Sequence, residues 1–378
     1  SQPIGPVKLF TVDNLTHEAK GVARVQGKVT FIANALPGET VKAQVVKSNR
    51  RYDQARLVSI EQQSAHRVEP ACPHYEVCGG CSFQHLEIEQ QRAAKMSWLQ
   101  GQLRKVWPEQ DISILSDSPL RYRRRARISV KMDGQTLKLG FRGQSSKHII
   151  SIDNCLVLTP RLQQVFAGLK LALSTAPIAE KIGHIELLED DLGPSVLIRL
   201  TAKISSVHIE TWQAWARTQQ FSLYWQHHDE KRASLDASAM RSYQVDGMRL
   251  TYHPQDFIQV NAAMNQKMVT QAMDWLAPNE DDFVLDLFCG IGNFSLPLAQ
   301  TAKKVIGIEG DDTAVQQAKA NATLNQRNNT EFHAADLFKP INTNPWAKQT
   351  FDKILLDPPR SGAQEILEYL PQWAPRLV

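Results

Sequence analysis

The sequence lacks the features of a membrane protein and of a secreted disulfide-bonded protein. No stretch approaches the roughly 18 consecutive apolar residues that a membrane span needs. The first thirty residues include Asp13 and Glu18 and contain no continuous apolar run, so no secretory signal is visible. The 378 residues include only five cysteines, an odd number that suits a disulfide scaffold poorly. We therefore expect a cytoplasmic protein that does not enter the membrane.

Three of the few cysteines are concentrated in one short stretch, CPHYEVCGGC. They are Cys72, Cys78 and Cys81, with the spacing C-x5-C-x2-C. In a reducing compartment, clustered thiols bind metal more often than they pair as disulfides. The stretch therefore predicts three metal ligands. A fourth has to come from elsewhere in the chain, because a tetrahedral thiolate site takes four.

An excess of charge is also absent from most of the chain. Residues 1–62 contain nine Lys or Arg against five Asp or Glu, whereas the remainder contains 34 of each. Basic charge concentrated in one module is a common footprint of binding to a phosphate backbone. A solvated charged surface explains this feature equally well, so the charge alone does not decide for RNA.

Patterns along the chain predict three domains. Up to residue 62, alternating stretches such as VARVQGKVTFIA are broken by turn signals, which indicates a small antiparallel β-barrel. Residues 63–255 contain the cysteine stretch, a helical run and then mixed strands and helices, which predicts an α+β domain. From 256 to 378 helices and strands alternate regularly, which predicts a doubly wound parallel sheet. The helical segment within 93–120 is expected to pack on this last domain.

The stretch VLDLFCGIGNFSLPLA carries the first sign of a cofactor site. A buried strand is expected to end at Asp286–Phe288, and Gly290 and Gly292 permit a tight turn with close approach to a ligand. The next strand ends in VIGIEG, which puts Glu309 where an acid can accept both hydroxyls of a ribose. Ordinary strand-to-helix turns also use glycine. However, Asp286 would repel a pyrophosphate and suits a cationic sulfonium, so the pattern favours S-adenosylmethionine over NAD.

A second sign is LLDPPRSG, again at a predicted strand end. Asp357 is followed by two prolines, which form a stiff turn beside the ligand crevice. On its own, such a turn can be a simple chain break. Enzymes that methylate exocyclic amines typically have an aromatic residue at the end of this turn, where it stacks on the base. Arg360 follows here instead, which argues against amine methylation.

The run RYRRRARISV brings a group of arginines into a predicted strand, namely Arg121, Arg123, Arg124, Arg125 and Arg127. An extended segment spreads such side chains over both of its faces, with Tyr122 available for stacking, which suits structured or single-stranded RNA. A solvated surface run is the plainer explanation. Beside a methyl-donor site and a basic barrel, we interpret the run as RNA-binding.

In their order along the chain, these motifs resemble the bacterial RNA uracil-C5 methyltransferases. The resemblance rests on the basic barrel and on CPHYEVCGGC, RYRRRAR, DFIQVN, DLFCGIGNFSLPLA and LLDPPRSGA, and it covers essentially the whole chain. Within the family, the chain most resembles the enzymes of 23S ribosomal RNA that carry a TRAM domain and an iron–sulfur cluster. The resemblance implies a multidomain α/β protein. An OB-like TRAM barrel would precede a central α+β RNA-binding domain with the iron–sulfur site and a C-terminal Rossmann-like methyltransferase domain.

The resemblance also implies ligands for both cofactors. Cys155, in IDNCLVL, would complete a [4Fe-4S] cluster with the three clustered cysteines, and zinc is the chemical alternative. Gln259 and Asp357 would touch the target base as well as S-adenosylmethionine, and Phe257 would join the arginines at the RNA. Asp336 stands where the family can have an amide. The residues implied to surround S-adenosylmethionine are Gln259, Phe288, Asn293, Glu309, Asp336 and Asp357.

The implied reaction needs a cysteine thiolate that adds to C6 of uracil and a base that removes the C5 proton. The family's nucleophile lies in a Ser-Cys-Asn-Pro motif after the DPPR turn, and this sequence stops at WAPRLV before such a motif. We therefore expect an incomplete methyltransferase domain, no catalytic residue within the chain, and a nucleophile after Val378. Cys289 is a weak substitute, because a cysteine beside the glycine turn should face the pocket wall.

The expected partner is 23S ribosomal RNA, and no obligate protein partner is evident. Two other functions remain open. One is an RNA-binding iron–sulfur protein that no longer turns over, and the other is a uracil-C5 methyltransferase of another RNA such as tRNA.

Overall fold

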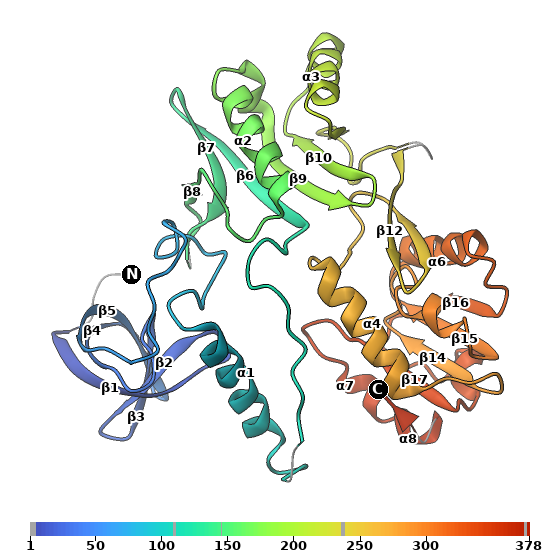
Figure 1. Ribbon diagram of the computed structural model, residues 1–378, viewed down its shortest axis with the longest axis horizontal. Coiled ribbons are helices and arrows are strands. Elements are labelled where there is room, and N and C mark those ends of the chain that lie inside the picture. The colour runs from blue at the N-terminus through green and yellow to red at the C-terminus, as the bar shows by residue number, and fades with distance from the viewer. Residues whose placement is uncertain (1–4, 109–110, 145, 236–238, 374–375) are drawn as a thin grey trace. The chain divides into compact units, whose positions relative to one another are not determined.

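The computed structural model describes residues 5–108, 111–144, 146–235, 239–373 and 376–378 (Figure 1). The chain forms two compact units. Unit 1 comprises Ser1–Ile114 and Lys138–Leu156, and unit 2 comprises Leu115–Leu137 and Val157–Val378. The unit that holds the barrel thus also holds residues 63–114. The three-domain division at 1–62, 63–255 and 256–378 stays a prediction.

Unit 1 begins with a closed β-barrel of strand order β1-β2-β3-β5-β4, which confirms the predicted barrel, although β3 and β5 pair parallel rather than antiparallel. Gln26 and Gly27 form the tight turn between β2 and β3 with φ of 50° and 81°, the left-handed conformation that two-residue hairpin turns require. The barrel core is built from small and branched side chains such as Val12, Ile32 and Val41. The strands are β1 (Val7–Leu15), β2 (Lys20–Val25), β3 (Lys28–Ala33), β4 (Thr40–Ser48) and β5 (Tyr52–Gln62).

The rest of unit 1 has less regular structure. Residues 63–87 form turns and short bridges. The helical run that follows is confirmed as α1 (Ile88–Leu103), which buries none of its residues. Strands β7 (Thr136–Arg142) and β8 (Ile149–Ser151) pair antiparallel. Gly140 is needed in this pair, because a Cβ there would collide with the carbonyl oxygen of Ile150.

Unit 2 begins with strands that lie side by side in the order β11, β10, β9, β6. Helix α2 packs on β9 and β10, and α3 packs on β11. The buried residues of α2 recur at helical spacing and include Leu162, Phe166 and Leu169. These elements are β6 (Arg125–Asp133), α2 (Pro160–Ser174), η1 (Pro177–Lys181), β9 (Ile182–Asp190), β10 (Gly193–Leu200), α3 (Ser206–Thr218) and β11 (Ser222–Gln226).

A hairpin of β12 (Arg241–Val245) and β13 (Met248–Tyr252) follows in unit 2. Its buried Arg241 forms an ion pair with Asp190 at the end of β9, and the hydroxyl of Tyr252 donates to the same carboxylate at 2.6 Å. A buried charge is tolerated only when it is paired and hydrogen-bonded, so Asp190 needs both of these partners. The shared carboxylate therefore fixes the hairpin to β9.

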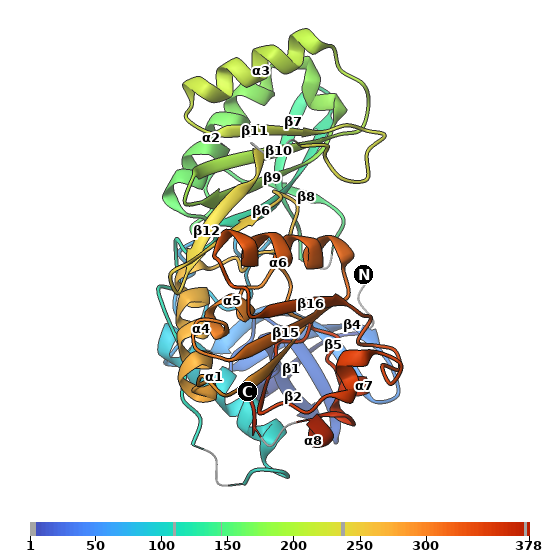
Figure 2. The same ribbon diagram turned by 90° about the vertical axis from the view of Figure 1, so that its right-hand side faces the viewer.

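The second sheet of unit 2 is parallel, with the order β16-β15-β14-β17-β18, which confirms the doubly wound prediction. Val284, Val305 and Leu355 point to one face, where α4, α5 and α6 cover them. Leu285 and Ile306 point to the other face, toward η3, α7 and α8 (Figure 2). The elements are α4 (Ala262–Leu276), β14 (Phe283–Leu287), α5 (Ser295–Leu298), β15 (Lys304–Glu309), α6 (Asp312–Leu324), β16 (Thr330–Ala334), η3 (Pro345–Lys348), β17 (Lys353–Leu356), α7 (Gln364–Leu367), α8 (Leu370–Trp373) and β18 (Arg376–Leu377).

Helix length and hydropathy agree with the lack of long apolar runs in the sequence. Among the residues with described positions, no helix is both long enough and apolar enough to span a bilayer.

Candidate functional site

The carboxyl ends of the parallel strands in unit 2 bring most of the predicted cofactor residues to one sheet edge. Leu287, the last residue of β14, pairs with Ile308 of β15 and with Leu356 of β17. Phe288, Glu309 and Asp357 each stand at or just after one of these strand ends. Ligands of open α/β sheets bind at this edge. The structure therefore brings these three predicted residues together.

The glycine turn after β14 has the backbone conformation that its sequence suggests. Phe288, Gly290 and Gly292 have φ of 65°, 55° and 96°, all in the left-handed region. A Cβ on Gly290 would meet nothing within 4 Å, so the main chain is open toward a ligand there. Phe288 adopts this conformation despite its side chain, and a strained backbone of this kind is most common at functional sites.

Main-chain groups hold Glu309 in a fixed orientation. Its Oε2 accepts from the N–H of Gly290 at 3.1 Å. Its Oε1 accepts from the N–H groups of Gly310 at 2.7 Å and Asp311 at 3.1 Å. A carboxylate has about four lone-pair positions and three are occupied, so about one remains, on Oε2, for a ribose hydroxyl. Glu309 is only partly buried and can reach such a ligand.

Asp286 lies fully buried one position before the end of β14. The hydroxyl of Ser295 donates to its Oδ2, while its Oδ1 has no hydrogen-bond partner among the described residues. Burial, with smaller contributions from the charges of Asp357 and Glu309, raises the pKa of Asp286 to about 7. A cation beside this carboxyl would compensate for the burial, which fits the sulfonium group expected from the sequence.

Asn293 is held by two side chains that the sequence analysis did not identify. Its amide exchanges two hydrogen bonds of 2.9 Å with the amide of Asn265 on α4, and its Oδ1 also accepts from the hydroxyl of Tyr243 at 2.9 Å. Asn265 shares the buried face of α4 with Val269 and Leu276. A polar residue within an apolar helical stripe was the sequence signal that could have revealed this pair.

The remaining predicted cofactor residues are less enclosed. Asp336 is exposed, forms an ion pair of 2.9 Å with Lys339 and accepts from the main chain of Phe338 at 3.0 Å. The ring of Phe338 lies 5.9 Å from that of Phe288. Asp357 lies at the surface, yet desolvation by the surrounding chain raises the pKa of its carboxyl.

Arg124 differs from its predicted role at an RNA surface, because it is buried with 5% of its area exposed. Its Nε donates to the carbonyl oxygen of Gln259 at 2.8 Å, and its guanidinium lies 4.8 Å from the ring centre of Tyr243. Its Nη2 has no partner among the described residues. The structure thus makes Arg124 an interior neighbour of Gln259, a predicted cofactor residue.

The other arginines of the run lie nearer the surface, where Arg121 and Arg127 are exposed and Arg123 is half-buried. Arg125 and Arg127 donate to the two oxygens of Glu186 at 2.8 and 2.9 Å. Burial alone would raise the pKa of Glu186, but its neighbours His184, Arg125 and Arg127 lower it to about 2. Arg125 is therefore committed to an internal ion pair.

Phe257 is 74% exposed, and its ring is therefore accessible to solvent. This exposure is compatible with its predicted contact with RNA, because exposed aromatic rings provide stacking surfaces for unpaired bases.

The four cysteines predicted to bind metal all belong to unit 1 and are partly exposed. Burial raises the pKa of the Cys78 thiol, and the charges of Cys81, Cys155 and Cys72 add to that increase, so the four sulfurs lie within electrostatic range. However, within the described part of the chain no three His, Cys, Asp or Glu side chains lie close enough to hold a metal ion. The three other thiols thus lie within electrostatic range of Cys78, and the described residues show no metal centre.

Cys289 is buried with 4% of its area exposed. Burial, reinforced by the nearby carboxyls of Asp286 and Glu309, raises the pKa of its thiol well above the usual value. A Cβ on Gly307 would lie 2.9 Å from its sulfur, which shows how closely the thiol packs on β15. A neutral, enclosed thiol is a poor nucleophile.

Comparison with known proteins agrees with this architecture. Residues 4–58 match the TRAM domain, and residues 87–377 match the family described as tRNA (Uracil-5-)-methyltransferase. A relative from Marinomonas sp. (strain MWYL1), named 23S rRNA (uracil(1939)-C(5))-methyltransferase RlmD, is 57% identical over 97% of this chain and 83% of its own length. A relative of the same name from Marinomonas posidonica is 52% identical over 100% of this chain and 86% of its own.

A solved structure with a similar fold is that of the Pyrococcus abyssi tRNA (uracil-54, C5)-methyltransferase in complex with S-adenosyl-L-homocysteine. It is 19% identical with a TM-score of 0.72, over 97% of this chain and 88% of that one. At this identity, the similarity concerns the fold alone. The match over residues 87–377 and the 57% identity to a nearly full-length relative together show that the chain belongs to the tRNA (uracil-5-)-methyltransferase family.

Proposed function

We propose that this chain supplies the cofactor and RNA sites of an enzyme that transfers a methyl group from S-adenosylmethionine to C5 of a uridine in 23S ribosomal RNA. The observation that carries the proposal is the edge formed by Glu309, the glycine turn and the buried Asp286. The names of the two Marinomonas relatives support the choice of RNA. S-adenosylmethionine supplies, when bound, a methyl group on a cationic sulfur.

The role proposed for each side chain at the cofactor follows from the contacts that this side chain makes. Glu309 would accept a ribose hydroxyl through its remaining lone-pair position, because three main-chain N–H groups already orient its carboxylate. Phe288 would line the adenine side of the site, where Asp336 could accept from the adenine amine. Asn293 would act through a fixed amide, since Asn265 and Tyr243 hold it.

The target uracil would lie beside Gln259 and Asp357. Arg124 donates to the main chain of Gln259 and keeps Nη2 available, so it could donate to a uracil carbonyl oxygen that becomes negative during the reaction. In the proposed reaction a cysteine thiolate adds to C6, C5 takes the methyl group, a base removes the C5 proton and the thiolate leaves. Cys289 is too enclosed for the role of this thiolate.

We propose a [4Fe-4S] cluster for the four cysteines of unit 1. Four partly exposed thiols in one unit could hold either a cluster or a single zinc ion, and the family resemblance of the cysteine pattern is what favours the cluster. The exposed arginines Arg121 and Arg127, together with Phe257, would contact the RNA.

The test of the cofactor site measures S-adenosylmethionine binding by calorimetry in wild type and in Glu309→Ala. We expect an affinity loss of about 2 kcal/mol, roughly thirtyfold, because charge-assisted hydrogen bonds would be lost. Asp312→Ala is the matched control, since Asp312 is an exposed acid three residues away in the first turn of α6. Equal affinities of the three proteins would contradict the assignment.

The RNA is tested separately, with a 23S fragment and a tRNA transcript offered to the same chain. Tighter binding of the 23S fragment supports the proposal, and tighter binding of tRNA would favour the other branch of the family. Labelled S-adenosylmethionine shows whether residues 1–378 methylate either RNA, and we expect no transfer. Label at uracil C5 that disappears in Cys289→Ser would instead make Cys289 the nucleophile.

A further inference from the structure

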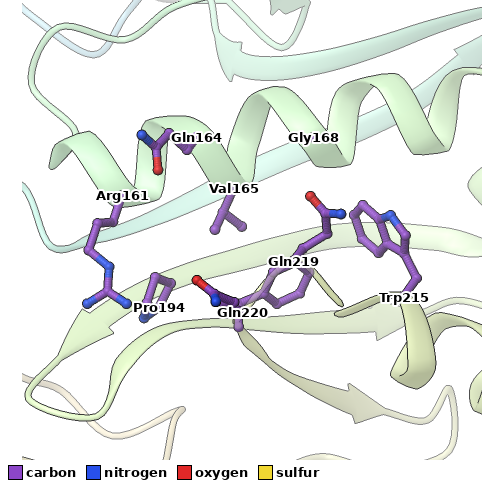
Figure 3. A pocket seen from close by; sticks show the side chains of 9 residues that line it. Arg161, Gln164, Val165, Gly168, Pro194, Trp215, Gln219 and Gln220 are labelled. Carbon is purple, nitrogen blue, oxygen red and sulfur yellow. The ribbon is translucent and has the colours of Figure 1, made fainter. Parts of the chain in front are cut away.

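A small polar pocket in unit 2 lies between α2 and the C-terminal end of α3, above β10 (Figure 3). Its volume is about 160 Å³. Figure 3 shows Arg161 at one end and Trp215 at the other, with Gln219 between them. Pockets for drug-sized ligands run from roughly 300 to 1,000 Å³, so this one suits a single flat group.

The lining combines an aromatic face with amides and one cation. Gln164, Gln219 and Gln220 are exposed, and their side-chain amides have no hydrogen-bond partner among the described residues. Arg161 is the charged lining residue, and its nearest carboxylate, Glu189, is 3.8 Å away. Amide groups can both donate and accept, and a guanidinium binds phosphate.

Neighbouring rings hold Trp215 in place. Its indole makes edge-on contacts with Trp212 at 5.2 Å and with Phe221 at 5.4 Å between ring centres. Both neighbours are buried, while Trp215 itself is partly exposed. The indole is thus a fixed aromatic surface, and ordering it on binding would cost little conformational entropy.

Two residues of this pocket oppose the local preferences of the backbone. Gly168 lies within α2, where glycine costs about 1 kcal/mol relative to alanine. Packing does not require it, because an added Cβ would meet only Trp215, at an ordinary 4.0 Å. The missing side chain therefore leaves the indole uncovered.

Gln220 presents the opposite case. It follows α3 with φ of 59°, in the left-handed position where helices usually end in glycine. The N–H of Phe221 bonds to the carbonyl of Ala216 at 3.2 Å, as expected of this type of helix end. A glycine is thus found where a side chain is preferred, and a side chain where glycine is preferred. Such departures from local preference concentrate at functional sites.

We propose that this pocket binds an unpaired base of the RNA substrate, stacked on Trp215 and hydrogen-bonded to the glutamine amides, with the adjoining phosphate at Arg161. The proposal rests on the proposed function, since it takes the ligand to be RNA. Unpaired bases are recognised by stacking on aromatic rings together with hydrogen bonds to their edges. The site would fix the register of the RNA through a nucleotide other than the methylated one.

A pair of substitutions at Gly168 separates filling of the pocket from damage to the fold. Gly168→Ala adds only the tolerated Cβ, whereas Gly168→Met fills the space over the indole. Both replace a helix-interior glycine, so both should keep or raise the melting temperature. We expect the Met variant to bind a 23S fragment at least fivefold more weakly than the Ala variant, by fluorescence anisotropy.

The double variant Gln164→Ala/Gln219→Ala tests the amides, and Gln316→Ala, an exposed glutamine of α6, is its control. We expect about a tenfold loss of RNA affinity in the double variant alone, as for a lost amide–base pair. Single 4-thiouridine substitutions along the fragment, cross-linked by light, should give an adduct within residues 206–222. Equal affinity of the folded Ala and Met variants, or adducts only elsewhere, would overturn the proposal while the proposed function stands. A wild-type chain that binds no 23S fragment would refute both.

Discussion

The sheet edge of unit 2 and the cysteine segment of unit 1 fix the positions of their predicted cofactor-binding side chains in different ways. At the edge, main-chain N–H groups orient Glu309, and apolar clusters cover both faces of the strands beneath it. In residues 63–87, the buried side chains are Tyr75, His85 and Leu86, and the cysteines follow turns. The geometry of the edge is therefore a property of the sheet, whereas the cysteine segment depends on a few side-chain contacts.

Those contacts are specific but small in number. The hydroxyl of Tyr75 donates to the carbonyl of Ser82 at 2.7 Å and lies 2.5 Å from His85 Nδ1. Arg67 ties the segment to Glu39 of the barrel at 2.6 Å. A segment with so little apolar burial commonly gains its stability from a metal or another cross-link. A bound metal or cofactor is therefore expected to stabilise unit 1 more than unit 2.

The largest effect should follow from removing a proposed cluster ligand. Cys155→Ser should lower the free energy of unfolding of unit 1 by about 3 kcal/mol or more, because ligation and folding share one free energy. Iron and sulfide content, measured after anaerobic purification, should fall together with the melting temperature. S-adenosylmethionine affinity should stay within twofold of wild type.

Cys289→Ser is the control, since Cys289 is buried in the turn after β14 in unit 2 and its replacement should leave the iron content unchanged. A wild-type chain that holds one zinc and no iron would refute the cluster. If the Cys155→Ser chain is as stable and contains as much iron as wild type, Cys155 is not a cluster ligand and unit 1 does not depend on it for stability.

A smaller effect is expected from the arginines, where Arg124 and Arg127 form a matched pair. Arg124→Ala should destabilise unit 2 by about 2 kcal/mol, because it removes a buried hydrogen bond and a cation–π contact with Tyr243. Arg127→Ala should change stability by no more than about 0.5 kcal/mol and should lower the log–log salt slope of RNA binding by about 0.7. Chemical denaturation and RNA titrations at several salt concentrations measure both. Equal losses of stability in the two variants would contradict the assignment of Arg124 to the interior and Arg127 to the RNA surface.

The sequence predicted those parts of the site that depend on local signals. Gly290 and Glu309 could be identified because a turn and a strand end are each encoded within a few residues. The burial of Arg124 could not be identified, since it depends on Tyr243 and Gln259, more than a hundred positions away. The Asn265–Asn293 pair was missed for the same reason, as its two members meet only when α4 packs on the sheet.

The same limit applies to the cysteines. Spacing identified the three thiols of the short stretch, the family resemblance added Cys155, and in unit 1 the charge of Cys155 acts on the Cys78 thiol. A zinc site and a cluster differ in the distances between their thiols, and these distances depend on the tertiary structure rather than on the spacing in the sequence.

The last expected effect concerns pH and the buried Asp286. Burial raises the pKa of this carboxyl to about 7, well above the value of 3.8 expected in an unfolded chain. The folded protein therefore keeps a proton that the unfolded chain releases. Stability from this group is complete below about pH 4 and decreases as the pH rises toward about 7, by at most about 1.4 kcal/mol per pH unit. Asp286→Asn should abolish this decrease in thermal melts of the chain without ligand.

The affinity for S-adenosylmethionine should change with pH in the opposite direction to the stability of the chain without ligand. A cationic sulfonium near Asp286 favours the ionised carboxylate, so binding should release a proton and S-adenosylmethionine affinity should increase between about pH 6 and 8. We expect a gain of about threefold, since one charge in a partly compensated site is involved. S-adenosylhomocysteine has a neutral sulfur and serves as the matched ligand, with a smaller gain expected. Parallel pH profiles for the two ligands in calorimetry would show that Asp286 does not sense the sulfonium, and the edge would then recognise the nucleoside through Glu309 alone.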